Sequence, residues 1–78
     1  MEILLFGITK DIVGTHSLHL DSADIHTVSD LKEWFLKKYP SMKGLGSLAV
    51  AVNNQFADDG DHIQASDELA LIPPVSGG

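Results

Sequence analysis

The sequence predicts an α+β fold of the order ββαββ, in which a mixed sheet packs on a single helix. Apolar or alternating segments of strand length lie on both sides of one amphipathic segment that begins with a helix-capping pattern. The chain has 78 residues, 44% of them hydrophobic, which allows only one small core. The last predicted strand leads directly into a segment rich in proline and glycine.

Two strands open the chain. The first is predicted at residues 2–8, where Ile3-Leu4-Leu5-Phe6 forms an unbroken apolar run. Residues 17–20 alternate polar and apolar side chains, as a half-buried strand does. Val13 and Gly14 lie between the two segments, and the glycine favours a turn, so we expect the two strands to form a hairpin.

A helix is predicted to begin after Thr27 and to end before Pro40. The Thr27 hydroxyl can cap the helix, and Asp30 can reach back toward it in a variant of the capping box. Proline disfavours helical backbone in the residue before it, so Pro40 marks the end of the helix. Apolar side chains recur at helical spacing and form one stripe: Val28, Leu31, Trp34 and Phe35.

Shorter segments complete the sheet. A helix between the second and third strands predicts at least one parallel strand pair. The order of elements fits the β-grasp topology of ubiquitin-like proteins. Residues 1–72 are predicted to form this domain, and residues 73–78 a C-terminal tail. The remaining predicted segments are a flexible loop at 43–47, strands at 48–52, 55–57 and 69–72, and turns at 53–54 and 58–61.

Composition argues against several classes of function. The chain has no cysteine, which excludes disulfides, zinc–thiolate sites and a thiol nucleophile. The chain has eleven acidic side chains, five lysines and no arginine. This excess of negative charge argues against binding of nucleic acid, or of a phosphorylated substrate, by this chain alone. No basic leader and no membrane-length apolar run is present, so a cytoplasmic protein that does not bind membranes is expected.

No set of side chains predicts catalysis. The aspartates around Gly60 lack the alternating spacing and the closing glutamate of a calcium loop, which favours a plain turn. Because no nucleophile, base and orienting group can be assembled, the chain is not expected to be an enzyme or to bind a cofactor or a metal. The four histidines are expected to be exposed to solvent and not bound to a metal. They are His16, His19, His26 and His62.

The tail is the remaining candidate for chemistry. It reads Pro73-Pro74-Val75-Ser76-Gly77-Gly78. Two prolines stiffen its start and two glycines leave its tip without side chains, while six extended residues span about 20 Å at up to ~3.6 Å per residue. A carboxylate at the tip of so thin an arm can enter a narrow site and be activated, typically by adenylation, before a sulfur or an amine attacks it. Gly78 is therefore the predicted reactive residue.

One helix can cover only one face of the predicted sheet. Alternation along the first and last strands places Leu4, Phe6, Ala70 and Ile72 on the face away from the helix. An uncovered apolar face marks either an interface or a surface covered by loops. The pattern alone favours neither, but the position of this face beside the root of the tail favours an interface. The residues predicted to face the helix are Ile3, Leu5, Leu69 and Leu71.

The last twelve residues, Asp67-Glu68-Leu69-Ala70-Leu71-Ile72-Pro73-Pro74-Val75-Ser76-Gly77-Gly78, carry a family resemblance. Shorter stretches that share it are Leu5-Phe6-Gly7, Val13-Gly14 and Ala51-Val52-Asn53. With these stretches the chain resembles, over essentially its full length, the small subunits of molybdopterin synthase, which are ubiquitin-like sulfur carriers.

The resemblance implies a function for the tail. An adenylyltransferase similar to ubiquitin-activating enzymes adenylates Gly78 with ATP, and a sulfur donor converts it to a thiocarboxylate. The tail then enters the large synthase subunit, where the sulfur attacks cyclic pyranopterin monophosphate to build the dithiolene of the molybdenum cofactor. The expected assembly is a heterotetramer of two small and two large subunits.

The resemblance also implies which residues contact the partners. The family motif places interface apolar residues at Phe6, Phe56 and Ile72. Family members often carry arginine at the position of Lys10 and an aromatic residue at Ile72, so a specific polar bond from Lys10 is not assigned. The tail residues expected to bind the partner are Pro73, Pro74, Val75 and Ser76, with Gly77 beside the reactive Gly78.

Three other readings remain open from the sequence. The chain could be a sulfur carrier for the thiazole of thiamine, although such carriers are usually shorter and lack the Pro-Pro-Val-Ser approach. It could be a ubiquitin-like modifier that forms isopeptide bonds with lysines. It could also be a plain interaction domain whose terminal glycines are incidental.

Overall fold

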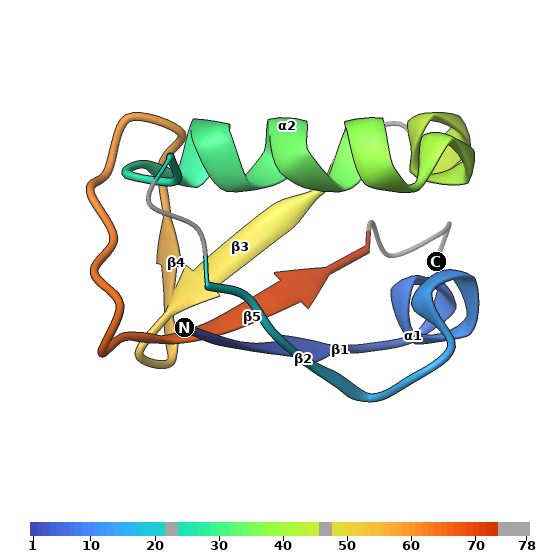
Figure 1. Ribbon diagram of the computed structural model, residues 1–78, viewed down its shortest axis with the longest axis horizontal. Helices are drawn as coiled ribbons and strands as arrows, with labels where there is room; N and C mark the ends of the chain where they lie inside the picture. The colour runs from blue at the N-terminus through green and yellow to red at the C-terminus, as the bar shows by residue number, and fades with distance from the viewer. Residues whose placement is uncertain (22–23, 46–47, 74–78) are drawn as a thin grey trace.

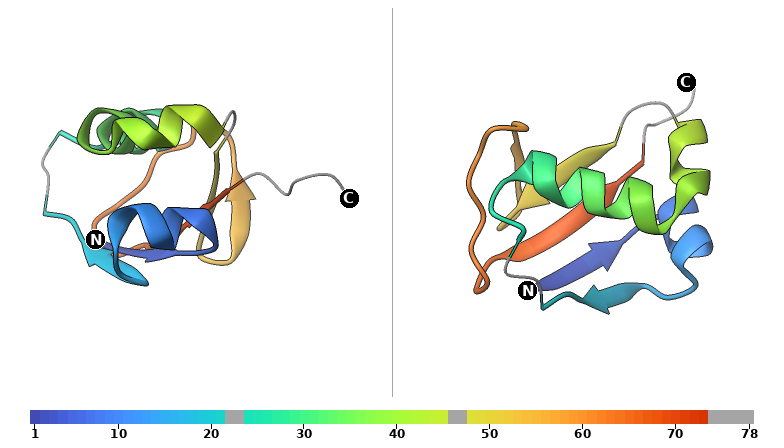
Figure 2. Two further views of the ribbon diagram at one scale, coloured as in Figure 1. Left: turned by 90° about the vertical axis from the view of Figure 1, so that its right-hand side faces the viewer. Right: turned by 45° about the horizontal axis from the view of Figure 1, so that its top comes forward.

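The computed structural model describes residues 1–21, 24–45 and 48–73. In these residues the chain has the predicted β-grasp arrangement, with a mixed sheet packed on one long helix. Helix α2 (Val28–Lys38) lies across one face of the sheet, and no helix of the described chain lies over the opposite face (Figures 1 and 2). The strands are β1 (Glu2–Leu5), β2 (Ser17–His19), β3 (Ala49–Val52), β4 (Gln55–Ala57) and β5 (Glu68–Ile72).

The last strand lies at the centre of the sheet, whose order is β2-β1-β5-β3-β4. Strand β5 pairs with β1 in parallel, with Ile3 opposite Leu69 and Leu5 opposite Leu71. The other neighbouring pairs are antiparallel. The prediction of a parallel pair is confirmed, and the pair is formed by the first and last strands.

The predicted hairpin of the first two strands is confirmed in its pairing, with Ile3 opposite Leu18. Its connection was predicted wrongly. The first strand ends at Leu5, three residues before the predicted end, and a helix, α1 (Ile8–Val13), occupies the connection. Gly7 has a φ of 57°, a conformation that residues with a Cβ rarely adopt, and it turns the chain out of the strand before Ile8.

The capping box of α2 is confirmed. The Asp30 amide donates to the Thr27 hydroxyl at 3.2 Å, and the Asp30 carboxylate accepts from the amides of Thr27, at 3.2 Å, and of His26, at 3.0 Å. These bonds hold the pKa of the Asp30 carboxyl below its usual value of 3.8, and the bond from the His26 amide is the largest cause. The helix ends before Pro40, as predicted.

The two predicted turns are confirmed. Asn53 and Asn54 have φ values of 52° and 70° and join β3 to β4, in the left-handed conformations that tight hairpins require. The turn at residues 58–61 packs against the start of α2, because the carbonyls of Asp59 and Asp61 accept from amides of the first turn of that helix. Lys32 pairs with the Asp59 carboxylate at 2.6 Å and fastens the same turn.

The predicted flexible loop at residues 43–47 was wrong in its first part. Residues 43–45 belong to η1 (Pro40–Leu45), a short 3-10 helix that buries Met42 completely. Burial of this side chain gives the segment a fixed position against the core. Gly46 and Ser47 lie outside the described residues.

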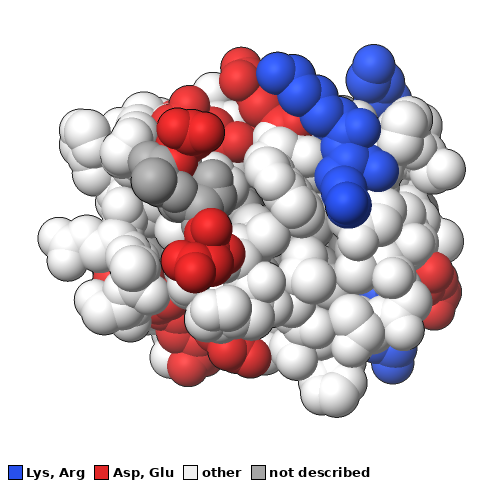
Figure 3. Space-filling view, viewed as in Figure 1, with Lys and Arg blue, Asp and Glu red and all other residues white. Residues whose placement is uncertain are grey.

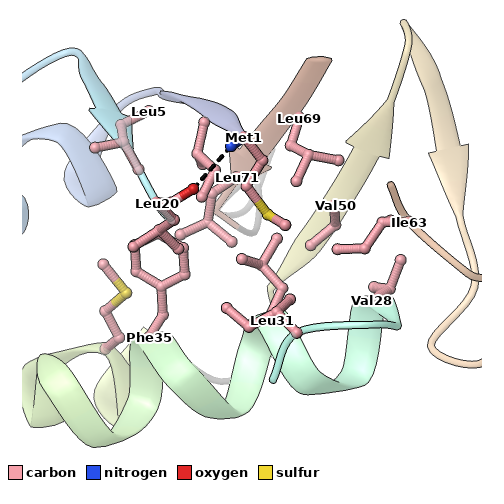
Figure 4. Packing of buried hydrophobic residues seen from close by; sticks show 13 residues of the cluster. Met1, Leu5, Leu20, Val28, Leu31, Phe35, Val50, Ile63, Leu69 and Leu71 are labelled. Atoms are coloured by element: carbon pink, nitrogen blue, oxygen red, sulfur yellow. Dashed lines mark hydrogen bonds between the residues drawn. The ribbon is translucent and has the colours of Figure 1, made fainter. Parts of the chain in front are cut away.

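The core fills the space between α2 and the sheet (Figure 4). Phe35 is its largest fully buried side chain, and it projects from α2 toward β1 and β5. The amine of Met1 donates to the Leu20 carbonyl at 2.7 Å and holds the start of β1 against the end of β2. In the part of the chain that the structure describes, no helix has the length and apolar character needed to cross a bilayer.

Candidate functional site

The candidate site begins where β5 ends, at Ile72 and Pro73. Pro73 is the first residue of the predicted tail and lies against Gly7, where a Cβ added to the glycine would stand 3.2 Å from the proline Cγ. That distance is tighter than an ordinary van der Waals contact, so the missing side chain of Gly7 makes room for the root of the tail. The rest of the predicted tail lies outside the described residues; it comprises Pro74, Val75, Ser76, Gly77 and Gly78.

Thr9 ties the root of the tail to the start of α1. Its side chain is fully buried, and its hydroxyl accepts from the Phe6 amide at 3.1 Å and donates to the Phe6 carbonyl at 2.5 Å. The same hydroxyl lies 3.4 Å from the carbonyl oxygen of Leu71 in β5. One buried polar side chain therefore links the end of β1, the first turn of α1 and the end of the strand that carries the tail.

The predicted facing of the sheet is confirmed. The residues predicted to face the helix are buried: Ile3, Leu5, Leu69 and Leu71. On the opposite side Leu4, Ala70 and Ile72 are only partly buried, and Phe6 is 48% exposed. We refer to the surface formed by Leu4, Phe6, Phe56, Ala70 and Ile72 as the open face.

The strand register assigns Phe56 to the open face. Leu4 pairs with Ala70, Ala70 with Ala51, and Ala51 with Phe56, and residues directly opposite one another on neighbouring strands point to the same side. Phe56 is 75% exposed, which is costly for an aromatic side chain unless a partner covers it. The prediction that Phe56 binds a partner came from the resemblance alone, and the register gives it a physical basis.

Sequence reasoning missed Ile8, which is 45% exposed at the first position of α1. It was assigned to a strand together with the apolar run before it. The spacing of Thr9, Ile12 and Val13, followed by glycine, was the available signal, because residues three and four apart share one face of a helix. Thr9 is buried, and Ile12 and Val13 pack against the core, whereas Ile8 stays exposed although it is four residues from Ile12.

The rest of the described chain holds no comparable chemistry. His16, His19, His26 and His62 are all exposed, as predicted. Among residues 1–21, 24–45 and 48–73, no group of histidines and carboxylates is arranged to hold a metal ion. The Nδ1 atom of His19 lies 3.8 Å from Oε2 of Glu2. Both side chains are exposed, so the pair contributes little to the free energy of unfolding.

Comparison with known proteins gives consistent matches over the whole chain. A family model described as the ThiS family matches residues 3–78. The molybdopterin synthase sulfur carrier subunit of Arabidopsis thaliana is 33% identical over 79 residues, which cover 100% of this chain and 82% of that protein.

Two solved structures share the fold. The crystal structure of SAMP1 from Haloferax volcanii has a TM-score of 0.79 and 30% sequence identity, and the match covers 100% of this chain and 98% of that chain. A protein–protein complex of subunits 1 and 2 of molybdopterin-converting factor from Helicobacter pylori contains a chain with a TM-score of 0.64 and 23% identity, matched over 99% of this chain and 96% of that one. At that identity the likeness shows the fold.

Proposed function

The chain belongs to the ThiS family, and from that membership we propose that it is a sulfur carrier for molybdopterin synthesis whose sulfur is held at Gly78. The family match runs through residue 78, so it includes the glycine pair. Two curated relatives that match the whole chain are named as sulfur carrier subunits of molybdopterin synthase. The chain itself performs no catalysis and delivers a reactive group to enzymes that do.

The proposed chemistry occurs at one carboxylate. An oxygen of Gly78 attacks the α-phosphorus of ATP on an adenylyltransferase and pyrophosphate leaves. Hydrosulfide sulfur from a donor then displaces AMP, which leaves a thiocarboxylate. In the large synthase subunit that sulfur attacks a carbon of cyclic pyranopterin monophosphate and displaces an oxygen substituent of that carbon. Water then cleaves the acyl–sulfur bond, so the sulfur stays on the pterin and the carrier returns as a carboxylate. Glycine suits both enzymes because it has no Cβ to widen the channel.

The observation that carries the proposal is the position of the open face beside the root of the tail. Ile72 directly precedes Pro73, the residue from which the chain continues to Gly78, and Phe6 directly precedes Gly7, which lies against Pro73. A partner that covers the exposed aromatic rings holds the domain at a fixed distance from its own active site, and about 20 Å of extended tail bridges that distance. A similar H. pylori subunit occurs in a complex with a second subunit, which supports a partner of this kind.

The test is the mass of the intact protein purified from its own cells, with and without the genes for the activating enzyme. The proposal expects a form in which one sulfur replaces one oxygen, located on the C-terminal peptide and absent without the activating enzyme. Affinity capture is expected to retain the large synthase subunit. Capture of a thiazole synthase in its place would assign the carrier to thiamine synthesis.

A second candidate is a protein modifier. It is favoured by the similarity to SAMP1, since a Haloferax volcanii relative at 30% identity is named small archaeal modifier protein 1. The same activated carboxylate would then acylate a lysine amine instead of accepting sulfur. High-mass conjugates with Gly78 joined to lysine, present in the same cells and lost without the activating enzyme, would support this function.

A further inference from the structure

The lysines of this chain are unevenly distributed along the sequence. Residues 34–57 contain three lysines and no aspartate or glutamate, although the whole chain has eleven carboxylates and a net charge of −6. Residues 58–68 contain five carboxylates and no lysine. We refer to Lys37, Lys38 and Lys43 as the lysine cluster.

The fold turns this pattern into a charge difference between the two ends of the molecule. Lys37 and Lys38 belong to the last turn of α2, Lys43 belongs to η1, and all three are exposed. Figure 1 shows the end of α2 and η1 at the same end of the molecule as the end of β5. In Figure 3 most of the basic atoms gather at that end, and most of the acidic atoms lie toward the other.

Carboxylates near the lysine cluster lie on the side of Lys37, because Glu33, one helical turn before it, lines a pocket with Lys37, Asp24 and Asp30. The positive charge of the cluster is therefore carried chiefly by Lys38 and Lys43. The ion pairs found among the described residues join Lys32 to Asp59 and His19 to Glu2, and neither includes the cluster. The negative end of the α2 dipole favours Lys37 and Lys38, but this effect falls off within one turn and does not account for Lys43. Lys10, on α1 at the same end, is followed directly by Asp11 and adds little net charge.

We propose that the lysine cluster is an electrostatic docking surface for the large synthase subunit, and that this partner carries aspartates and glutamates beside the opening that receives the tail. The inference rests on the proposed function, because the partner must approach the end where β5 leads into the tail. The open face and the cluster then lie on two sides of the tail root, one making apolar contacts and the other making charged contacts.

The cluster also has a kinetic role in this arrangement. A carrier with a net charge of −6 is repelled by an acidic partner unless its positive end leads. Charge separation turns the molecule so that the tail arrives first, which raises the association rate more than it slows dissociation. Nucleic acid is a poor fit to the same surface, because three lysines on an acidic chain release few counterions.

The test uses the full-length carrier and the large subunit from the same organism, mixed by stopped flow over a range of salt concentrations. Neutralising the cluster with Lys37→Gln, Lys38→Gln and Lys43→Gln is expected to lower the association rate about tenfold at low salt, to flatten its salt dependence, and to change dissociation little. The matched control adds the same charge at the far end, through Gln64→Glu, Ala65→Glu and Ser66→Glu, all at exposed positions. It is expected to change the association rate less than about twofold.

A charge-preserving variant, with all three lysines replaced by arginine, is expected to associate like the wild type. If the glutamine variant binds at the wild-type rate with the wild-type salt dependence, the docking surface is refuted while the carrier function stands. If the wild type forms no complex with the large subunit at any salt concentration, both ideas fail. A concentration-dependent dimer in sedimentation of the wild type alone, absent from the glutamine variant, would assign the cluster to a second copy and refute the proposal as well.

Discussion

A Cβ atom on Gly7 would lie 3.2 Å from the Cγ of Pro73. These residues are far apart in sequence and meet because β1 and β5 are parallel neighbours that end side by side. The contact couples the backbone of the first turn after β1 to the direction in which the chain leaves β5. Substitutions at this point should therefore affect both the stability of the domain and the aim of the tail.

Gly7→Ala is expected to destabilise the domain by about 1–3 kcal/mol, the range for a residue held in a sparsely populated backbone conformation. The reason is the φ of 57°, to which the close approach of Pro73 adds. Urea unfolding measures the loss, and Gly60→Ala is the control, because a Cβ there meets no atom within 4 Å. Equal stability of the two variants would contradict the role assigned to Gly7.

Thr9→Val is expected to cost about 1–3 kcal/mol, because it leaves the Phe6 amide without the hydroxyl that accepts from it. Thr9→Ser keeps the hydroxyl and should recover most of the loss. Hydrogen exchange of the Phe6 amide provides a second readout, with faster exchange expected in the valine variant. Unchanged exchange in that variant would show that the hydroxyl does not protect the turn.

Phe6→Asp is expected to weaken the complex with the large subunit by at least about tenfold, because it places a charge in the apolar centre of the contact. The melting temperature of the isolated carrier should stay within a few degrees of the wild type, since the side chain is 48% exposed. Leu5→Asp is the matched control, because its side chain is 2% exposed and faces the core. That variant should fail to fold, and a large loss of stability in Phe6→Asp would mean that Phe6 belongs to the core.

Deletion of Gly78 is expected to abolish sulfur loading by the activating enzyme and to leave the fold intact. The buried residues of the described core end at Leu71, so no core side chain is removed. Circular dichroism and urea unfolding check the fold, and intact mass after incubation with ATP, activating enzyme and sulfide checks the loading. Loss of folding in the deletion variant would contradict the separation of domain and tail.

Asp30→Asn should destabilise the protein near neutral pH, because the asparagine cannot accept the amide bonds of the capping box as strongly as a carboxylate does. The pKa of Asp30 is lowered in the folded state, so its stabilising effect is fully present above the usual value of 3.8 and is lost as pH falls through the lower folded pKa. The stability difference between wild type and variant should therefore disappear in acid. Asp11→Asn, on the exposed surface of α1, is the control and should stay close to the wild type throughout.

The features that sequence predicted well depend on local pattern. Alternation along β1 and β5 gave the correct facing of both strands, because a side-chain period of two leaves one face buried. The Thr27 and Asp30 pair marked the start of α2 to the residue. The two asparagines marked the turn between β3 and β4, since asparagine accepts the left-handed conformations that such a turn needs.

The features that sequence missed depend on tertiary contact. Residues 3–6 and Ile8 form a nearly continuous apolar stretch, and that pattern alone does not show that the strand ends before Gly7, which adopts a φ of 57° and lies against Pro73 from the other end of the chain. Helix α1 has only six residues, too few to be stable without the core contacts of Ile12 and Val13. The glycines near η1 predicted a loop, but burial of Met42 fixes that segment.

The central position of β5 has a consequence for biosynthesis. This strand joins β2 and β1 on one side to β3 and β4 on the other, so the sheet stays in two halves until β5 has left the ribosome. A nascent chain that stops before Glu68 can form hairpins but cannot close its core, and quality control can remove it as unfolded. Assembly of the domain therefore acts as a check on synthesis, because a copy that has folded has also made the strand from which the tail continues.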